Sequence, residues 1–203
     1  MLSKNLINIG LGTASMAGVN MIGANAYKRL TNQEIEKLLN YCFEYSKKYP
    51  LKKIMIDTSS QYGESEKRLS EYFLKNLQKR KKFLVSSKWG LKFDKQNFSI
   101  KDFSLDNLNR SIEQSIKLLG KIDLYYIHTN PSINLNNLGF IINQNDEIQK
   151  KFISLKDKKV GGIKYLGISV SSLENLNFLL DNIRKLKYLD FIQINAQLII
   201  ENP

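Results

Sequence analysis

Short apolar runs alternate along this chain with longer stretches in which apolar residues recur every three or four positions. The short runs are rich in β-branched and aromatic residues and lie at 6–10, 53–57, 83–87, 122–128, 165–169 and 191–195. Runs of this length are typical of buried strands, and their alternation with helical patterns is typical of a parallel α/β protein. The pattern therefore predicts six strands joined by five helices.

The five predicted helices are recognised by apolar residues that repeat on one face. These residues are Ile35, Leu38, Leu39 and Cys42; Leu69, Tyr72, Phe73 and Leu77; Leu105, Leu108, Ile112, Ile116 and Leu119; Ile148, Phe152 and Leu155; and Leu176, Leu179, Leu180 and Ile183. Thr31 with Glu34, and Ser171 with Glu174, have the spacing of a capping box at a helix start. Gly120 is placed to end the third helix with a left-handed residue.

Polar residues end the second to the sixth predicted strand. They are Asp57, Lys88, His128, Ser169 and Gln193. In a barrel of parallel strands the carboxyl ends share one rim, where active sites are built. Taken singly, an Asp at this place is often a cap, a Lys is usually solvated and a His is often structural. Their coincidence on successive strands favours a functional site at the rim.

Composition and charge limit the classes of protein to consider. The 203 residues suit one domain, 1–203, and no run of 18 uncharged apolar residues predicts a membrane span. The N-terminal apolar stretch before Ala24-Asn25-Ala26 imitates a signal peptide, but its Asn and Gly residues favour a strand and loop. The single cysteine excludes an intramolecular disulfide and a Cys-rich zinc site, which predicts a cytoplasmic setting.

The formal charge of +12 raises the alternative of a nucleic-acid or anionic-lipid partner. The lysines, however, are spread over the polar faces of predicted helices and over turns. The densest run, at 79–82, lies where a helix is predicted to end and where cations favour the helix dipole. We therefore expect a solvated basic surface, with no nucleic acid and no membrane as partner.

The longest motif is at residues 56–66, Ile-Asp-Thr-Ser-Ser-Gln-Tyr-Gly-Glu-Ser-Glu, followed by Leu69, and it resembles the strongest motif of the aldo-keto reductases. Further matches follow in the family's order: Gly-Leu-Gly-Thr at 10–13, Ser-Lys-Trp-Gly at 87–90, Asp-Leu-Tyr-Tyr-Ile-His at 123–128 and Gly-Ile-Lys-Tyr-Leu-Gly-Ile-Ser at 162–169. A Rossmann dinucleotide motif at Gly10 is excluded, because Ser15 stands at the third glycine position and a loop follows.

The resemblance implies a (β/α)8 TIM barrel, of which about six β/α units are present, and an NAD(P)H-dependent oxidoreductase. Its implied catalytic residues are Asp57, Tyr62, Lys88 and His128, with no metal ligands. Hydride addition places charge on the carbonyl oxygen, so a proton donor is needed. Tyr62 is expected to be that donor, assisted by the Lys88 cation. Asp57 is expected to hold Lys88, and His128 to orient an aldehyde or ketone.

For the cofactor, the resemblance implies NADP(H) first, with NAD(H) as the alternative. Ser169 and Gln193 are expected to bind its carboxamide, while Gly12, Thr13 and Asp57 lie near its ribose. One departure concerns Val170, since many relatives have asparagine there and valine offers no polar group. One carboxamide contact is then missing.

The length is a second departure, because such barrels typically take about 250 residues and this chain ends at Pro203, just after the sixth predicted strand. We expect strands seven and eight to be absent, which leaves two open edges able to associate. Three explanations stand side by side: a fragment of a longer protein, a truncated and inactive remnant or scaffold, and a barrel completed by another chain or a second copy.

Overall fold

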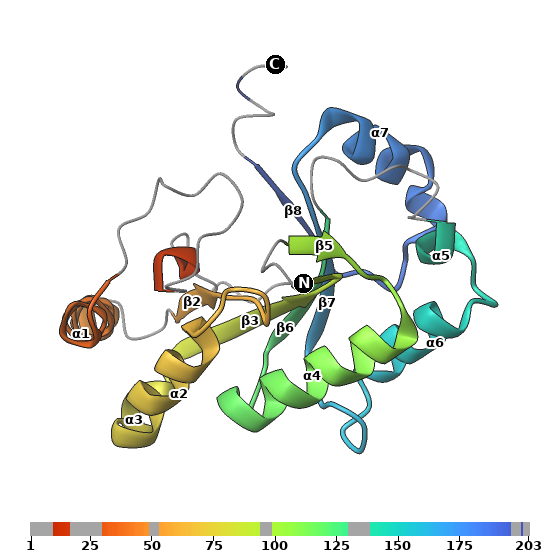
Figure 1. The fold of residues 1–203 in the computed structure, drawn as a ribbon. Coiled ribbons are helices and arrows are strands. Elements are labelled where there is room, and N and C mark those ends of the chain that lie inside the picture. Colours follow the sequence, from red (N-terminus) through yellow and green to blue (C-terminus); the bar gives the residue numbers. More distant parts are fainter. Residues whose placement is uncertain are drawn as a thin grey trace.

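A computed structural model describes residues 10–16, 30–48, 53–93, 99–129, 139–195 and 200. Six parallel strands form one curled sheet, and helices α1, α2, α4, α6 and α7 lie around its outer side (Figure 1). The strands, in spatial order, are β1 (Gly10–Gly12), β2 (Ile54–Asp57), β3 (Phe83–Trp89), β6 (Leu124–His128), β7 (Tyr165–Val170) and β8 (Phe191–Ile194). Spatial order follows chain order throughout. The predicted α/β fold, a partial TIM barrel, is confirmed.

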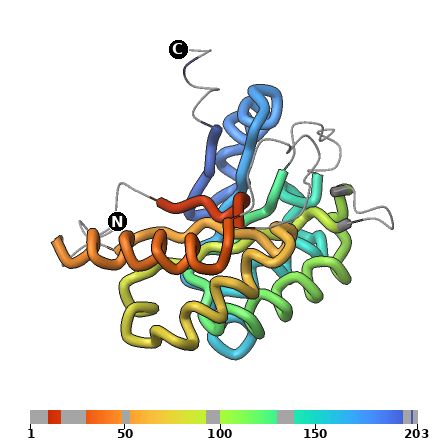
Figure 2. The backbone as a smooth tube through the Cα atoms, turned by 60° about the vertical axis from the view of Figure 1, so that its left-hand side comes forward, coloured from red at the N-terminus to blue at the C-terminus, as the bar shows by residue number. Residues whose placement is uncertain are grey.

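Except for α5, the helices occupy the segments in which apolar residues were spaced for one buried face. They are α1 (Asn32–Lys48), α2 (Ser65–Lys75), α3 (Leu77–Arg80), α4 (Leu105–Leu119), α5 (Gly139–Ile142), α6 (Glu147–Ser154) and α7 (Leu173–Asp181), with 3-10 turns at Ala14–Met16 and Ile183–Lys185. The helices α2 and α4 pack side by side on the sheet, and α4 also contacts α6 (Figure 2). None of the helices within the described residues is long and apolar enough to cross a bilayer.

The strand predictions were accurate at the centre of the sheet and poorest at its first strand. The third strand extends two residues further than expected, to Trp89, so Lys88 lies inside β3 and not after it. The expected first strand at 6–10 shares only Gly10 with β1, and residues 6–9 lie outside the described residues. Each residue of β3 is buried, because strands cover it on both sides and both of its faces are packed.

Two elements between the predicted ones were missed. A short antiparallel hairpin, β4 (Leu91–Phe93) with β5 (Ser99–Lys101), follows β3, and the four-residue helix α5 precedes α6. Three-residue strands and a single helical turn are too short to produce a periodic pattern. Residues 130–138 of the predicted loop after β6 lie outside the described residues.

The helix ends test the predicted caps. The Thr31 capping box is confirmed: the Glu34 N–H donates to Thr31 Oγ1 at 3.2 Å, and the Thr31 N–H donates to Glu34 Oε2 at 2.7 Å. The cap predicted at Ser171 is wrong by one residue, since the N-cap of α7 is Ser172, whose Oγ accepts from the Asn175 N–H at 3.2 Å. Gly120 does end α4 with a positive φ of 71°, although its ψ of −74° lies outside the αL region.

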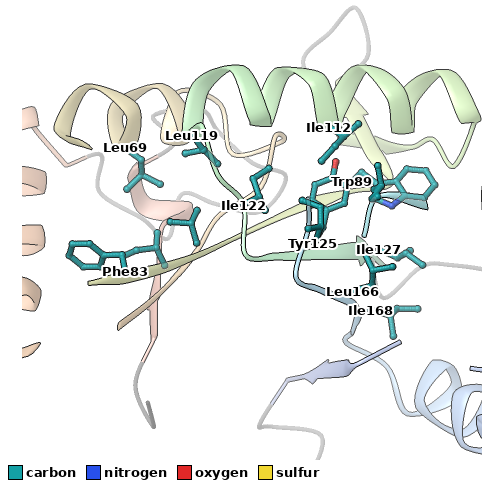
Figure 3. Packing of buried hydrophobic residues seen from close by; sticks show 14 of the residues in the cluster. Leu69, Phe83, Trp89, Ile112, Leu119, Ile122, Tyr125, Ile127, Leu166 and Ile168 are labelled. Atoms are coloured by element: carbon teal, nitrogen blue, oxygen red, sulfur yellow. The ribbon is translucent and has the colours of Figure 1, made fainter. Parts of the chain in front are cut away.

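The main hydrophobic core lies between the sheet and its outer helices. Figure 3 shows Phe83, Tyr125 and Ile127 on the strands facing Ile112 and Leu119 on α4. A smaller cluster, formed by Leu84, Leu124 and Tyr126, lies on the inner face of the sheet. Successive residues of β3 and β6 therefore point alternately to the two clusters, as period-two strands require. This alternation determines which residues can face the inside of the barrel.

Candidate active site

The carboxyl ends of the strands bring the predicted site residues to one rim. In the sheet register Gly12 lies opposite Asp57, and Asp57 lies opposite Ser86. Farther along the sheet, His128 lies opposite Ser169, which in turn lies opposite Gln193. The polar ends of five predicted strands are thus neighbours in space.

Lys88 and Asp57 form the central ion pair of this rim. Lys88 Nζ is 2.6 Å from both Asp57 Oδ1 and Asp57 Oδ2 and also donates to the Thr58 carbonyl oxygen at 3.3 Å. The Lys88 side chain is 2% exposed and that of Asp57 is 17% exposed. Burial lowers the pKa of Lys88, and the charge and hydrogen bonds of Asp57 oppose that shift. Asp57 therefore favours the charged form of Lys88.

Two further donors hold the Asp57 carboxylate, and neither contact was predicted from the sequence. Ser86 Oγ donates to Asp57 Oδ1 at 2.8 Å. Gln193 Nε2 donates to Asp57 Oδ2 at 3.3 Å, so the side chain predicted to contact the cofactor also bonds within the site. The position of Ser86 could have been predicted, because the period-two alternation of β3 places it on the same face as Lys88.

Tyr62 lies on the loop between β2 and α2, beside both the cation and the histidine. Lys88 Nζ is 5.3 Å from the centroid of the Tyr62 ring. The Tyr62 and His128 rings are 6.0 Å apart between centroids and meet edge to face at 83°. The structure therefore brings together all four residues predicted to be catalytic.

His128 lies at the end of β6 with one ring nitrogen enclosed. Nδ1 is buried and has no hydrogen-bond partner among the described residues. Burial lowers the pKa of His128 to about 3; the nearby Lys88 cation adds to this shift and Asp57 opposes it. The imidazole is consequently neutral near pH 7, and a neutral imidazole carries one N–H donor and one acceptor nitrogen.

Thr13 and Gly12, both predicted to lie near a cofactor ribose, have different surroundings. Thr13 is fully buried, and its hydroxyl donates to the Asp57 carbonyl oxygen at 3.0 Å and accepts from Ser65 Oγ at 2.7 Å. Ser65 Oγ also lies 3.0 Å from Thr58 Oγ1. The Thr13 side chain thus supports the loop after β2. Gly12 borders open space, because a Cβ added there would meet no atom within 4 Å.

Ser169 and Val170 end β7. Ser169 lies at the rim and is 9% exposed. Val170 is 3% exposed and belongs to the hydrophobic core between the sheet and the helices. Its side chain therefore contributes to packing at this position, where relatives were expected to carry an amide.

The fold and the rim together define a class: a TIM-barrel-type α/β protein with a buried Lys–Asp pair, a tyrosine and a histidine at the carboxyl ends of its strands. Residues 8–200 match the sequence profile of the Aldo/keto reductase family. Because this match spans nearly the whole chain, the protein belongs to the aldo/keto reductase family. A comparison with curated protein sequences found no significant match.

Solved structures agree with this assignment. A Pseudomonas aeruginosa protein assigned to the aldo-keto reductases is 26% identical, with a TM-score of 0.64 over 92% of this chain and 62% of its own. An aldo-keto reductase from Bacillus halodurans, solved in its holo form, is 18% identical, with a TM-score of 0.63 over 92% of this chain and 52% of its own. At that identity the second likeness supports the fold alone. The chain thus spans about three fifths or less of the length of these relatives.

Proposed function

We propose that this chain reduces an aldehyde or ketone with a hydride from a nicotinamide cofactor, and that Tyr62 donates the proton. The observation that carries the proposal is the position of Lys88, which bonds both Asp57 oxygens at 2.6 Å and lies 5.3 Å from the Tyr62 ring centroid. A cation this close to a phenol stabilises the phenolate that remains after the proton has left. Tyr62 is therefore the side chain of the site best suited to general-acid catalysis.

The other residues act through Tyr62 or on the carbonyl. Asp57 keeps Lys88 charged and in place, because it offers two acceptor oxygens in a buried setting. His128, neutral near pH 7, can donate one hydrogen bond to the carbonyl oxygen and so orient it beside Tyr62. The edge-to-face packing of the two rings supports a shared substrate position.

The rim residues also fit a nicotinamide cofactor, which when bound supplies the hydride that no side chain can supply. Gly12 leaves open space at the end of β1, and Ser169 and Gln193 offer polar groups at the ends of β7 and β8. We propose these three as cofactor contacts, together with Asp57. NADP(H) is our first expectation and NAD(H) the alternative.

The test is the consumption of NADPH and of NADH with a panel of aldehydes and ketones. Replacement of the phenol in Tyr62→Phe should lower turnover by about 10²–10⁴-fold, the usual contribution of a general acid, while cofactor affinity stays near that of the parent. Tyr41→Phe is the matched control, because Tyr41 is 70% exposed on α1 and should leave turnover unchanged. Equal turnover in Tyr62→Phe and the parent would refute the assigned role.

Fluorescence titration with NADPH and NADH separates the enzyme from a scaffold of the same ancestry. The buried Val170, in place of an amide, is the observation in favour of the scaffold. Cofactor binding without turnover on any carbonyl would support it. Turnover that depends on Tyr62 would exclude it.

A further inference from the structure

A buried carboxyl group lies behind the active site, on the outer face of the sheet. Glu66, in the first turn of α2, is 2% exposed. Its Oε1 accepts from Ser87 Oγ at 2.6 Å and from Ser115 Oγ at 2.8 Å. These two bonds join α2 to β3 and to α4, whereas Glu66 Oε2 is buried without a hydrogen-bond partner among the described residues.

Ser87 and Lys88 are consecutive on β3 and therefore point to opposite faces of the sheet. Lys88 turns inward to Asp57, and Ser87 turns outward to Glu66 and Ser115. A change in the position of β3 at Ser87 must also move Lys88. Glu66 thus acts from outside on the strand position that carries the cation of the site.

Glu66 is linked to Tyr62 as well, because the tyrosine lies four residues earlier on the loop that enters α2. Within that loop the Ser65 N–H donates to the Tyr62 carbonyl oxygen at 2.8 Å. On the inner side, Ser60 Oγ donates to the Lys88 carbonyl oxygen at 3.1 Å. The segment that carries Tyr62 is consequently tied to β3 at residue 88 from inside and at residue 87 from outside.

We propose that Glu66 is a positioning residue, which holds the Tyr62 loop in register with Lys88 through the hydroxyl groups of Ser87 and Ser115. The inference rests on the proposed function, since it matters for the reaction only if Tyr62 and Lys88 perform it. Burial raises the pKa of Glu66, and the two serine hydrogen bonds oppose that shift. What the role requires is an acceptor oxygen at this place and not a charge.

Four variants test this role. E66A removes the acceptor, and E66Q keeps an acceptor oxygen without the charge. S115A removes one of the two donors. The matched control is S111A: Ser111 lies one turn earlier on α4, is also buried, and bonds to Asn107 Oδ1 at 3.4 Å.

Two readouts are measured on each variant, after its thermal unfolding has shown that it folds. The first is kcat and KM with reduced cofactor. The second is the pH titration of the Tyr62 resonance in protein labelled with ¹³C on the tyrosine rings, assigned by its loss in Tyr62→Phe. We expect E66A to lower kcat about 10-fold, with KM nearly unchanged, because small displacements of a reacting group slow turnover. We also expect it to raise the Tyr62 titration midpoint by about one pH unit as the cation moves away.

E66Q should keep kcat and the Tyr62 titration midpoint close to those of the parent. S115A should show part of both E66A effects, and S111A should show neither. The role is overturned if a folded E66A behaves as the parent in both readouts, or if E66Q is as impaired as E66A. If E66A does not fold, the comparison of S115A with S111A decides. If the parent itself shows no turnover, the proposed function fails, and the Tyr62 titration alone still decides whether Glu66 positions the pair.

Discussion

The site depends on side chains whose ionisation is changed by burial. Lys88 is almost fully buried and remains beside Tyr62 because Asp57 supplies the opposite charge. His128 is held neutral mainly because its ring is desolvated. For both residues we therefore expect the free energy of unfolding to depend on the cost of placing a charge at a buried position, and not on surface charges.

Removal of the Lys88 cation should strongly destabilise the fold. In Lys88→Met the Asp57 carboxylate loses its partner in a largely buried position, and breaking a buried pair on one side costs about 3 kcal/mol or more. The matched control is Lys92→Met: Lys92 bonds Asp102 at 2.7 Å but is 43% exposed, so we expect a loss below about 1 kcal/mol. Urea unfolding measures both.

The double variant with Asp57→Asn should recover part of the Lys88→Met loss, because no uncompensated charge then stays buried. Equal losses in Lys88→Met and Lys92→Met would contradict this account of the pair.

The single histidine gives a specific pH dependence of stability. Its pKa is lowered to about 3 in the folded chain, compared with about 6.5 in an unfolded one. Above pH 6.5 neither state binds the proton, so stability is fully present. Below that pH the unfolded chain binds it first, and stability is lost as the pH falls toward the folded pKa.

The experiment compares urea unfolding of the parent and of His128→Gln, which contains no histidine. Between pH 6.5 and pH 5 the parent should lose about 2 kcal/mol more than the variant, at 1.36 kcal/mol per pH unit. Parallel pH profiles for the two proteins would show that His128 ionises normally in the folded state.

The helix N-termini show how accurately a local sequence pattern predicts the capping residue. The Thr31–Glu34 box was correctly predicted, because its two bonds lie within four consecutive residues. The cap of α7 was placed one residue too early. Ser171 and Ser172 are adjacent and equally suited to capping, and the strand β7 before them determines which one starts the helix.

Replacing each serine in turn by alanine shows which of the two caps α7. Ser172→Ala should cost about 1 kcal/mol, the usual value for an N-cap, because the Asn175 N–H then loses its acceptor. Ser171→Ala should cost less, since Ser171 Oγ is buried without a hydrogen-bond partner among the described residues. Thermal unfolding of both variants measures the difference. A greater loss for Ser171→Ala would favour the cap predicted from sequence.

At the scale of the whole sheet, the two edge strands, β1 and β8, are its exposed part. Within the described residues β1 pairs only with β2, and β8 pairs only with β7. An edge strand presents unpaired backbone groups that can pair with another chain. We therefore propose that this chain associates through the edges β1 and β8.

Sedimentation at several concentrations tests the association. The parent should show masses above the 23.5 kDa of one chain, increasing with concentration. Ile194→Lys puts a charge on the edge strand β8 and should shift the distribution toward one chain, because charged edges resist pairing. A single species of 23.5 kDa at every concentration would refute the proposal.

Most of the fold followed from local patterns. A strand covered on both faces is marked by consecutive apolar residues, as at Phe83, Leu84 and Val85 of β3, and a helix on the sheet needs one apolar face, as at Leu105–Leu119. The order of the polar strand ends indicated the rim. The hairpin β4–β5 and helix α5 were not predicted, because elements of three or four residues are too short to show a periodic pattern of apolar residues.

The contacts within the site could not be predicted in the same way. The bond from Gln193 to Asp57 joins residues 136 positions apart, and that from Ser115 to Glu66 joins residues 49 apart. Such pairs depend on how the sheet curls and how the helices pack against it. The amino-acid order was sufficient to predict which residue types lie at the rim, since strand period and chain direction are local properties. Which side chains bond one another there depends on the packing of distant segments.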